Sequence, residues 1–498
     1  MKSLKQLFIV CFLLACFFSC KTEHKQDIET NRYAEFLNKL QKQGITTGNV
    51  LVYKNGKVVY KNASGLRSIN PKDSLTLDSQ FRLASVSKQF TGMAIMKLKE
   101  AGKLDYDQKV NSILPNFPYA DISIRHLLYH TSGLTDYERL LAYNWKPADS
   151  TKKYILGNDE IIKEIYRVNP ELDFKTGEKW EYSNTGYLFL ASIVEKVSGQ
   201  HFRTFLKEQI FEPLKMNNTV LYKYQEAEDL NMPNRVFGYE TTLNQLDLKL
   251  NDYNLVNDVR GDGGIYSTLE DLYKWNMALV NSTIISKEYL DEAFKPGKLN
   301  NGEETRYGFG WFIESKNEPK VVFHSGGWVG FGTYLYNELD DQSGMILLTN
   351  NSNNNLRDIV FGLTNISKNK PYEMPKLKAE RVLAKKILNE DIDKGIAYYH
   401  EIKTDTTTYE VTENNINQLG YLLLQNGNVN ESIQIFKLNI DEYPESANVY
   451  DSYGDALLEK GDSINALSNF KKCYEMDNTL EYALDKATKL EAMINKNI

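Results

Sequence analysis

Two short apolar runs near the N-terminus, 50–53 and 58–60, flank the dipeptide Asn55-Gly56. Asn-Gly between two such runs is a strong signal for a β-hairpin, because both residues tolerate positive φ. Four further strand-like runs lie at 307–313, 321–324, 332–336 and 345–349. Strands at both ends of this region, with helical patterns between them, predict one antiparallel sheet with helices packed on and beside it.

Between these strands the apolar residues follow a helical spacing. One helix is expected from Ser85 to near Gly102 and a short one around 125–130. A longer helix should run from Asn184 to about Val197 and stop at Gly199. Another is expected after 261–264, with Ser267 or Thr268 as its cap.

After about residue 367 the pattern becomes purely helical and repeats. Several glycine, small and aromatic positions recur 34 residues apart, among them Gly420 with Gly454 and Phe436 with Phe470. This period resembles tetratricopeptide repeats. A degenerate earlier unit is expected over 378–403 and a capping helix over 480–493. The predicted domains are therefore 33–366, a linker over 367–377, and helical repeats over 378–498.

The N-terminal pattern predicts a targeting segment. Lys2 and Lys5 precede an apolar run over 7–18 that is too short for a comfortable membrane span. A cysteine at the end of such a run resembles a bacterial lipoprotein signal. Cys20 is the preferred lipidation site, because polar residues follow it directly, although Cys16 has the better preceding residues. We expect a signal peptide over 1–19, a tether over 20–32, and a protein lipid-anchored to the bacterial cell envelope, or secreted if the leader is simply removed.

Composition narrows the class of protein. The 498 residues are 42% hydrophobic and 25% charged, as in ordinary globular proteins, and the net charge of −7 argues against a nucleic-acid partner. Outside the leader and Cys20, Cys473 is the remaining cysteine. A disulfide framework and a zinc–thiolate site are therefore excluded.

Candidate chemistry begins with Ser85-Val86-Ser87-Lys88. Serine and lysine three apart share one helix face, so the lysine can take the hydroxyl proton, and the helix N-terminus favours the alkoxide. Tyr182-Ser183-Asn184 precedes an apolar helix and offers a phenol and an amide. His324-Ser325-Gly326-Gly327 lies on a strand edge, where the glycines let a substrate carbonyl approach the backbone.

These three motifs, in this order, resemble those of the penicillin-recognising serine hydrolases, and most closely the branch that contains class C β-lactamases, D-alanyl-D-alanine carboxypeptidases, D-aminopeptidases and related esterases. The stretches 130–134 and 261–268 support the resemblance, which covers roughly 33–365. It implies an α+β fold: a β-lactamase/transpeptidase-like domain, with an antiparallel sheet, flanking helices and a helical subdomain, followed here by the all-α tetratricopeptide-like domain.

The resemblance also implies roles. Ser85 is the nucleophile, Lys88 its base, and Tyr182 shuttles protons to the leaving group. Asn184 binds the substrate amide, and the backbone N–H groups of Ser85 and Gly327 form the oxyanion hole. No cofactor is implied.

His324 departs from the pattern, because class C β-lactamases usually carry lysine there, a cation that suits a substrate carboxylate. Histidine is partly neutral near pH 7. We therefore expect a serine hydrolase acting through an acyl-enzyme on an ester, amide or D-amino-acid peptide bond. β-Lactam hydrolysis, or a non-hydrolytic peptidoglycan or peptide sensor that signals through the repeats, remain alternatives. The repeats are expected to bind a protein partner, and Trp328 either to wall the pocket or to lie in the core.

His126 and His130 lie four residues apart on a predicted helix, which is the spacing of the zinc ligands in a metalloprotease motif. Leu127 stands where a metalloprotease needs glutamate. Both histidines are therefore expected to pack and to anchor the loop.

Overall fold

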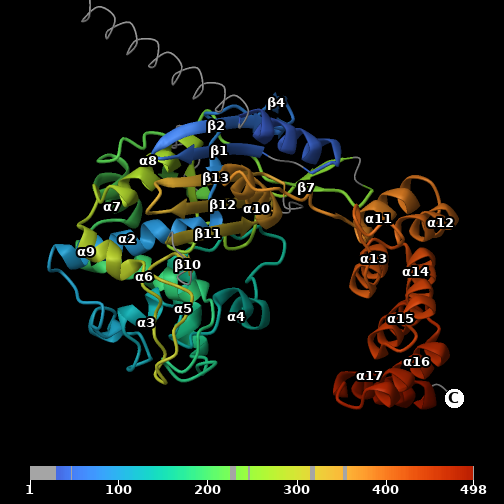
Figure 1. The fold of residues 1–498 in the computed structure, drawn as a ribbon. Coiled ribbons are helices and arrows are strands. Elements are labelled where there is room, and N and C mark those ends of the chain that lie inside the picture. Colours follow the sequence, from blue (N-terminus) through green and yellow to red (C-terminus); the bar gives the residue numbers. More distant parts are fainter. Residues whose placement is uncertain are drawn as a thin grey trace, which may run out of the picture. The chain divides into compact units, whose positions relative to one another are not determined.

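The computed structural model describes residues 30–45, 48–224, 232–244, 247–314, 320–351 and 356–496. The chain divides into two compact units (Figure 1). The first contains the described residues up to Glu240 together with Leu250–Glu373, and the second contains Thr241–Lys249 and Met374–Ile498. The predicted signal peptide and Cys20 lie outside the described residues. A helix already begins at residue 30, inside the expected tether.

The first unit is built around one six-stranded sheet. Its strand order is β10-β11-β12-β13-β1-β2, and every neighbouring pair is antiparallel. The strands are β1 (Gly48–Lys54), β2 (Lys57–Ser64), β10 (Phe312–Glu314), β11 (Val321–Trp328), β12 (Phe331–Glu338) and β13 (Ser343–Thr349). The predicted hairpin is confirmed, with positive φ at both Asn55 and Gly56. In the sheet, β1 pairs with β13, so the first and the last strand of this sheet in chain order are neighbours.

Short strands lie beside the main sheet. They are β3 (Leu66–Ile69) with β4 (Lys72–Ser74), β7 (Tyr239–Thr241) with β8 (Leu248–Leu250), and a three-stranded sheet of β5 (Phe81–Arg82), β9 (Ile265–Ser267) and β6 (Val220–Leu221). The strand β5 ends three residues before the predicted nucleophile Ser85, and β9 directly follows the glycine-rich loop 261–264. This small sheet therefore brings two predicted motifs together.

The helices of the first unit follow a helix over 30–42. They are α2 (Ser87–Glu100), α3 (Ile124–Leu128), α4 (Tyr137–Asn144), α5 (Asn158–Val168), α6 (Asn184–Ser198), α7 (Phe202–Leu206), α8 (Leu269–Val280), α9 (Lys287–Ala293) and α10 (Leu356–Ser367). The predicted ends are confirmed where glycine or threonine sets them. Gly199 ends α6 in the left-handed conformation, and the Thr268 side chain caps α8.

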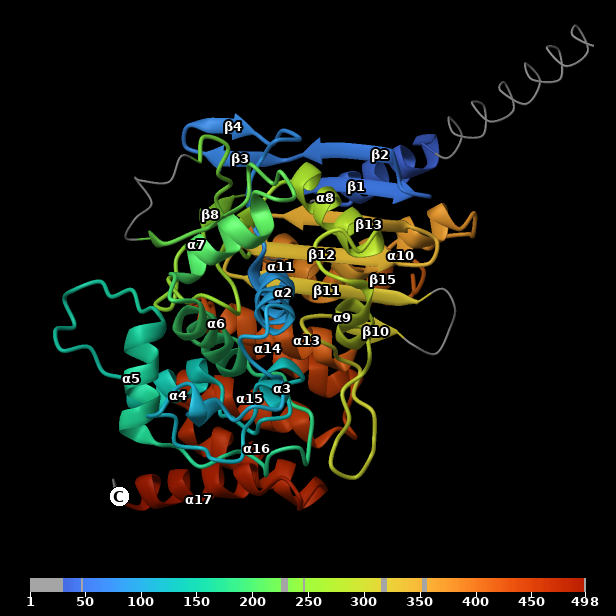
Figure 2. The same ribbon diagram turned by 90° about the vertical axis from the view of Figure 1, so that its left-hand side faces the viewer.

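Helix α2 forms the centre of the core, between the sheet and the helices α3 and α6 (Figure 2). Its residues are buried on every side, which is why its apolar pattern is broad rather than a single stripe. Phe90 stacks on Trp275 with ring centroids 4.3 Å apart. At Gly92 a Cβ would stand 2.0 Å from the carbonyl oxygen of Phe309, so only glycine lets this segment approach so closely.

Within the second unit, the described residues 374–496 are helical apart from one short strand pair. Its helices are α11 (Ala379–Asn389), α12 (Ile392–Ile402), α13 (Glu413–Gln425), α14 (Val429–Glu442), α15 (Ala447–Glu459), α16 (Ser463–Met476) and α17 (Glu481–Lys496). The strand β14 (Leu377–Lys378) pairs in parallel with β15 (Tyr409–Glu410). Helices α11, α13, α15 and α17 begin at residues 379, 413, 447 and 481, at intervals of 34 residues. Gly420 and Gly454 each make room for the phenylalanine ring of the next helix.

The sequence pattern does not predict the excursion 241–249, which leaves the first unit between β7 and β8 and belongs to the second. Leu243 packs against the cluster that contains Ala379, Leu383 and Ile387. The amide of Asn389 donates to the backbone carbonyl of Asn244. None of the helices within the described residues has the length and apolar character that crossing a membrane requires.

Candidate active site

Ser85 lies where β5 turns into α2. The turn is a short 3-10 helix, η1 (Ala84–Val86), and Ala84 has a left-handed backbone with φ of 49°. Such a conformation is unfavourable for alanine and persists only when surrounding contacts hold it. Here the hydroxyl of Thr333 donates to the carbonyl of Leu83 over 2.8 Å, and the Leu83 amide donates to the carbonyl of Ile265. The nucleophile therefore sits on a rigid, strained turn.

Lys88 is fully buried one turn further along α2. Its ammonium donates to Ser85 Oγ over 3.2 Å, to Asn184 Oδ1 over 2.8 Å and to the backbone carbonyl of Asp262 over 3.0 Å. Three acceptors from three segments compensate the cost of removing this group from water. The arrangement places the lysine nitrogen within proton-transfer distance of the serine oxygen.

Tyr182 and Asn184 come from the segment that starts α6. The backbone N–H of Asn184 donates to Asp136 Oδ2 over 2.9 Å, which fixes the first turn of the helix. The Lys88 nitrogen lies 4.8 Å from the centroid of the Tyr182 ring. The Tyr182 hydroxyl is buried and has no hydrogen-bond partner within the described part of the chain. Tyr182 itself is not among the residues that line the cavity beside Ser85.

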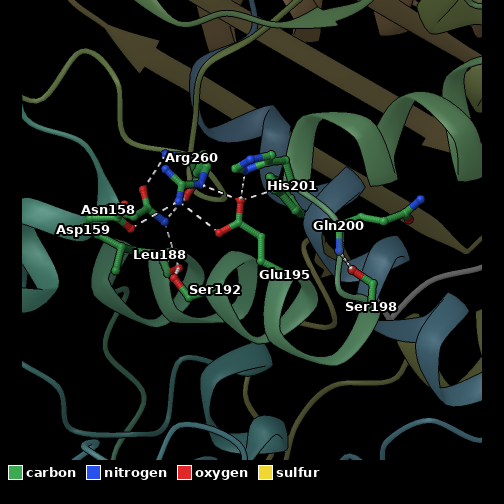
Figure 3. Close-up of polar contacts among 10 residues, drawn as sticks. Asn158, Asp159, Leu188, Ser192, Glu195, Ser198, Gln200, His201 and Arg260 are labelled. Carbon is green, nitrogen blue, oxygen red and sulfur yellow. Dashed lines mark hydrogen bonds and ion pairs between the residues drawn. The ribbon is translucent and has the colours of Figure 1, made fainter.

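The glycine-rich loop 261–264 supplies the third acceptor of Lys88, a role that the sequence did not reveal. Its position is set by Asn158, whose side chain accepts from the Arg260 backbone N–H and donates to the Arg260 carbonyl (Figure 3). The Arg260 guanidinium in turn donates to both carboxylate oxygens of Glu195 on α6. Inside the site, Tyr137 donates to the Asp262 carboxylate over 2.7 Å, and burial raises the pKa of Asp262.

His324 lies in β11 but does not line the cavity beside Ser85. Its Nε2 is 2.9 Å from the Tyr307 hydroxyl, and its Nδ1 is 2.5 Å from the carbonyl oxygen of Ser325. Burial, and then the charge of Lys88, lower the pKa of His324 to about 3. The imidazole is therefore neutral near pH 7, and both ring nitrogens are engaged inside the protein.

The two glycines of the same motif differ. A Cβ at Gly326 would stand 2.2 Å from the Leu83 carbonyl oxygen, so this glycine lets β11 pack directly against the turn that carries Ser85. Gly327 faces open space and lines the cavity together with Ser85. The strand thus brings the Gly327 backbone to the same cavity as the nucleophile.

His126 and His130 each bind a different backbone N–H group. The backbone N–H of Ser123 donates to His126 Nδ1, which closes the first turn of α3. The backbone N–H of Ser183 donates to His130 Nδ1 over 3.1 Å, and the His130 ring packs 4.4 Å from the Tyr182 ring. Burial lowers the pKa of His130 well below its usual value. His130 is thus a neutral group that anchors the Tyr182 segment.

A small, open cavity lies beside Ser85. Asn184, Gly327 and Trp328 line it, together with Arg82 and Glu138, neither of which sequence reasoning identified. Trp328 therefore walls the cavity, one of the two positions expected for it. A second, larger cavity adjoins the first and shares Glu138, Gly327 and Trp328 with it.

The fold and this site define the first unit as a β-lactamase/transpeptidase-like domain of the penicillin-recognising serine hydrolases. A family model described as Beta-lactamase matches residues 32–360, and the chain belongs to that family. Penicillin-binding protein 4* of Bacillus subtilis (strain 168) is 35% identical over 377 residues, which cover 74% of this chain and 82% of that protein.

Two solved structures extend the comparison. The octameric penicillin-binding protein homologue from Pyrococcus abyssi matches with a TM-score of 0.58 and 26% identity, over 68% of this chain and 77% of that one. The D-amino acid amidase from Ochrobactrum anthropi SV3, solved with L-phenylalanine amide, matches with a TM-score of 0.57 over 68% of this chain and 99% of that one. At 22% identity the amidase shows the shared fold.

Proposed function

We propose that the protein is a serine hydrolase that cleaves an ester, amide or D-amino-acid peptide bond through an acyl-enzyme on Ser85. The observation that carries this proposal is the 3.2 Å contact between Lys88 Nζ and Ser85 Oγ at an open cavity. A nucleophile and its base at hydrogen-bond distance, with the base oriented by further groups, are the requirement for covalent catalysis.

For the first step Lys88 gives the extra proton of its resting ammonium to solvent and acts as an amine. Ser85 Oγ then attacks the substrate carbonyl carbon, and its proton passes to that amine. The carbonyl oxygen becomes an oxyanion, which the backbone N–H groups of Ser85 and Gly327 stabilise. The bond to the leaving group then breaks, and Tyr182 passes the proton to the departing oxygen or nitrogen. Water attacks the acyl-enzyme, releases the acid and restores the proton to Ser85.

The neutral character of His324 supports esters, amides and D-amino-acid peptides over β-lactams. A substrate carboxylate is best held by a permanent cation, and His324 offers none near pH 7. The shared fold with a D-amino acid amidase agrees with this substrate class.

We further propose that Cys20 carries a lipid anchor that tethers the protein to the cell envelope, and that the helices over 378–498 are tetratricopeptide-like repeats that bind a protein partner. The 34-residue interval between helix starts supports the repeat assignment. Alanine in place of Cys20 should release the protein from the membrane fraction. Membrane retention of that variant would contradict the anchor.

The test of the proposed activity is a substrate panel with the full chain. It contains p-nitrophenyl esters, D-amino-acid amides, a D-alanyl-D-alanine peptide and nitrocefin. Turnover of at least one of the first three, absent in Ser85→Ala and kept in Ser192→Ala, is expected. Ser192 is a matched control, because its hydroxyl bonds only the carbonyl of Leu188 in the same helix (Figure 3). Nitrocefin as the sole good substrate would identify a β-lactamase instead.

A further inference from the structure

The ammonium group of Lys88 is buried, and each of its three hydrogen-bond acceptors is uncharged. The acceptors are Ser85 Oγ, Asn184 Oδ1 and the backbone carbonyl oxygen of Asp262, at 3.2, 2.8 and 3.0 Å. Neutral acceptors replace the hydrogen bonds that water would make, but they do not neutralise the positive charge. The charge state of this buried group therefore depends on carboxylates at longer range.

Asp262 supplies a carboxylate beside the carbonyl that Lys88 already contacts. The residue is 7% exposed and lines the cavity next to Ser85. The hydroxyl of Tyr137, which is itself buried, donates to Asp262 Oδ2 over 2.7 Å and holds the carboxylate in a fixed position. The contact from Lys88 needs only a backbone carbonyl, which every residue has. It therefore leaves the carboxylate of Asp262 without a role.

The charges of Lys88 and Asp262 are coupled. Burial raises the pKa of Asp262, while the charge of Lys88 and the hydrogen bond from Tyr137 lower it. An electrostatic interaction is reciprocal, so a cation that favours the ionised carboxylate is favoured by that carboxylate to the same extent. The ionised form of Asp262 accordingly stabilises the ammonium form of Lys88.

Other titratable side chains face Lys88 from the elements packed around it. Among the described residues these are Tyr182 and Tyr187 from the segment that starts α6, His130 from the segment after α3, His324 from β11 and Glu138 from α4. Burial lowers the pKa of His324 to about 3 and that of His130 well below its usual value. Burial also raises the pKa of Tyr187 well above its usual value. These three groups are neutral near pH 7 and do not offset the charge of Lys88.

Two acids at the start of α4 also lie near the pair. Asp136 accepts the backbone N–H of Glu138 on one oxygen and that of Asn184 on the other, so its charge has two donors of its own. Burial, and then Asp136 and Asp262, raise the pKa of Glu138 to about 7. Glu138 is therefore only partly ionised near pH 7, and its effect on Lys88 has to be separated from that of Asp262.

We propose that Asp262 is a positioning residue for the base of the reaction: its carboxylate, fixed by Tyr137, holds Lys88 in the ammonium form at rest and so sets the pH above which Lys88 acts as an amine. The inference rests on the proposed function, because it concerns the base of the same site. Asp262 itself exchanges no proton and forms no bond with the substrate. It defines the pH range in which the Ser85 hydroxyl is activated.

Asp262→Asn tests this role, because it removes the charge and keeps the hydrogen bonds. The backbone carbonyl still accepts from Lys88, and the amide oxygen of asparagine can still accept from Tyr137. The full chain is prepared with ¹³Cε-labelled lysine, and the Lys88 signal is identified by its loss in Lys88→Arg. Its titration midpoint is recorded by NMR between pH 5 and 11 in the wild type, Asp262→Asn, Glu138→Gln and Asp159→Asn. Asp159 is 75% exposed on α5 and controls for the loss of one carboxylate.

The Lys88 midpoint should fall by about one pH unit or more in Asp262→Asn, as expected when a nearby opposite charge is removed. Glu138→Gln should lower it by less, and Asp159→Asn should leave it unchanged. Tyr137→Phe removes the donor that favours the ionised carboxylate, so it should also lower the midpoint, and it decides the question if Asp262→Asn does not fold. A midpoint that stays or rises in these two variants, or that falls equally in Glu138→Gln, would overturn the role of Asp262.

Kinetics with the p-nitrophenyl ester give a second readout. The acid limb of kcat/KM against pH should move to lower pH by the same amount in Asp262→Asn, because kcat/KM reports the protonation of the free enzyme. A merely structural defect would lower the rate at every pH and leave the limb in place. Failure of the proposed function would appear separately, as absent turnover by the wild-type chain in the substrate panel, whereas the NMR midpoint decides the role of Asp262 with or without turnover.

Discussion

At the scale of single residues, Lys88 is the group that connects the three segments of the site. Its ammonium contacts the nucleophile on the turn before α2, the amide at the start of α6 and the carbonyl of the loop before β9. Replacing Lys88 with alanine removes the proposed base and leaves Asn184 Oδ1 without its donor. A positioned base contributes about 10² to 10⁴ in rate. We expect kcat/KM for a p-nitrophenyl ester to decrease by about 10²-fold to 10⁴-fold or more.

The matched control for this variant is Lys103→Ala, since Lys103 is exposed just past the end of α2. It should keep wild-type kinetics. If Lys88→Ala kept more than a third of wild-type activity, a group other than Lys88 would have to accept the Ser85 hydroxyl proton.

His324 makes a separate prediction about pH. The imidazole of an unfolded chain takes up a proton near pH 6.5, whereas burial keeps His324 neutral in the folded protein down to about pH 3. The unfolded state therefore binds more protons between these values, and stability should fall as the pH drops below 6.5. The expected loss from His324 is about 1.4 kcal/mol per pH unit.

The measurement is urea unfolding of the full chain at pH 7, 6, 5 and 4.5. His324→Gln should reduce the slope of stability against pH by about that amount. His201→Gln should leave the slope unchanged, because the His201 side chain is 92% exposed. An unaltered slope in His324→Gln would mean that the histidine is protonated in the folded state.

At the scale of elements, the loop 261–264 depends on the clamp made by Asn158 at the start of α5. Asn158 is fully buried and bonds both backbone groups of Arg260. Asn158→Ala leaves these groups unpaired, at a cost of about 1–3 kcal/mol. Because the same loop carries the Asp262 carbonyl that holds Lys88, kcat should also fall, by about tenfold or more, with a smaller change in KM.

Asp159→Ala is the control for the clamp. Asp159 neighbours Asn158 but is 75% exposed and makes only a 3.4 Å contact with Arg260 (Figure 3). An exposed pair of this kind contributes little. If both variants lowered kcat equally, the effect would come from α5 as a whole and not from the clamp.

How far the sequence predicts these elements depends on whether the signal is local. The β1–β2 turn, the cap of α8 and the end of α6 follow from Asn55-Gly56, Thr268 and Gly199, whose preferences act within a few residues. The proximity of Ser85 and Lys88 follows from helix geometry in the same way.

Long-range contacts carry no local signal. The excursion 241–249, the strained backbone of Ala84 and the role of the Asp262 carbonyl each depend on segments far away in the chain. The motif His324-Ser325-Gly326-Gly327 was recognised, but the direction of the His324 ring is set by Tyr307, which no pattern marks. Glu138 was missed because a lone acid in a first helical turn is ordinarily a helix-dipole partner.

At the scale of the whole molecule, the two units have separate hydrophobic cores. Every residue assigned to the active site lies in the first. Gly454→Ala would place a Cβ 2.6 Å from a ring carbon of Phe470 in the second unit, which costs about 1–3 kcal/mol. Calorimetry of the full chain should show an unfolding transition that moves to lower temperature, while ester hydrolysis at 25 °C stays unchanged.

Lys460→Ala serves as the control for Gly454→Ala, because Lys460 is exposed at the end of α15. It should move neither the transition nor the rate. Loss of hydrolysis in Gly454→Ala while the first unit remains folded would show that the repeats contribute directly to catalysis.

The central claim, an acyl-enzyme on Ser85, is tested most directly by intact-mass spectrometry after reaction with a fluorophosphonate probe, followed by peptide mapping. A single adduct on Ser85, absent in Ser85→Ala and present in Ser192→Ala, is the predicted result. An adduct on another residue, or no adduct in the folded wild-type chain, would contradict the account.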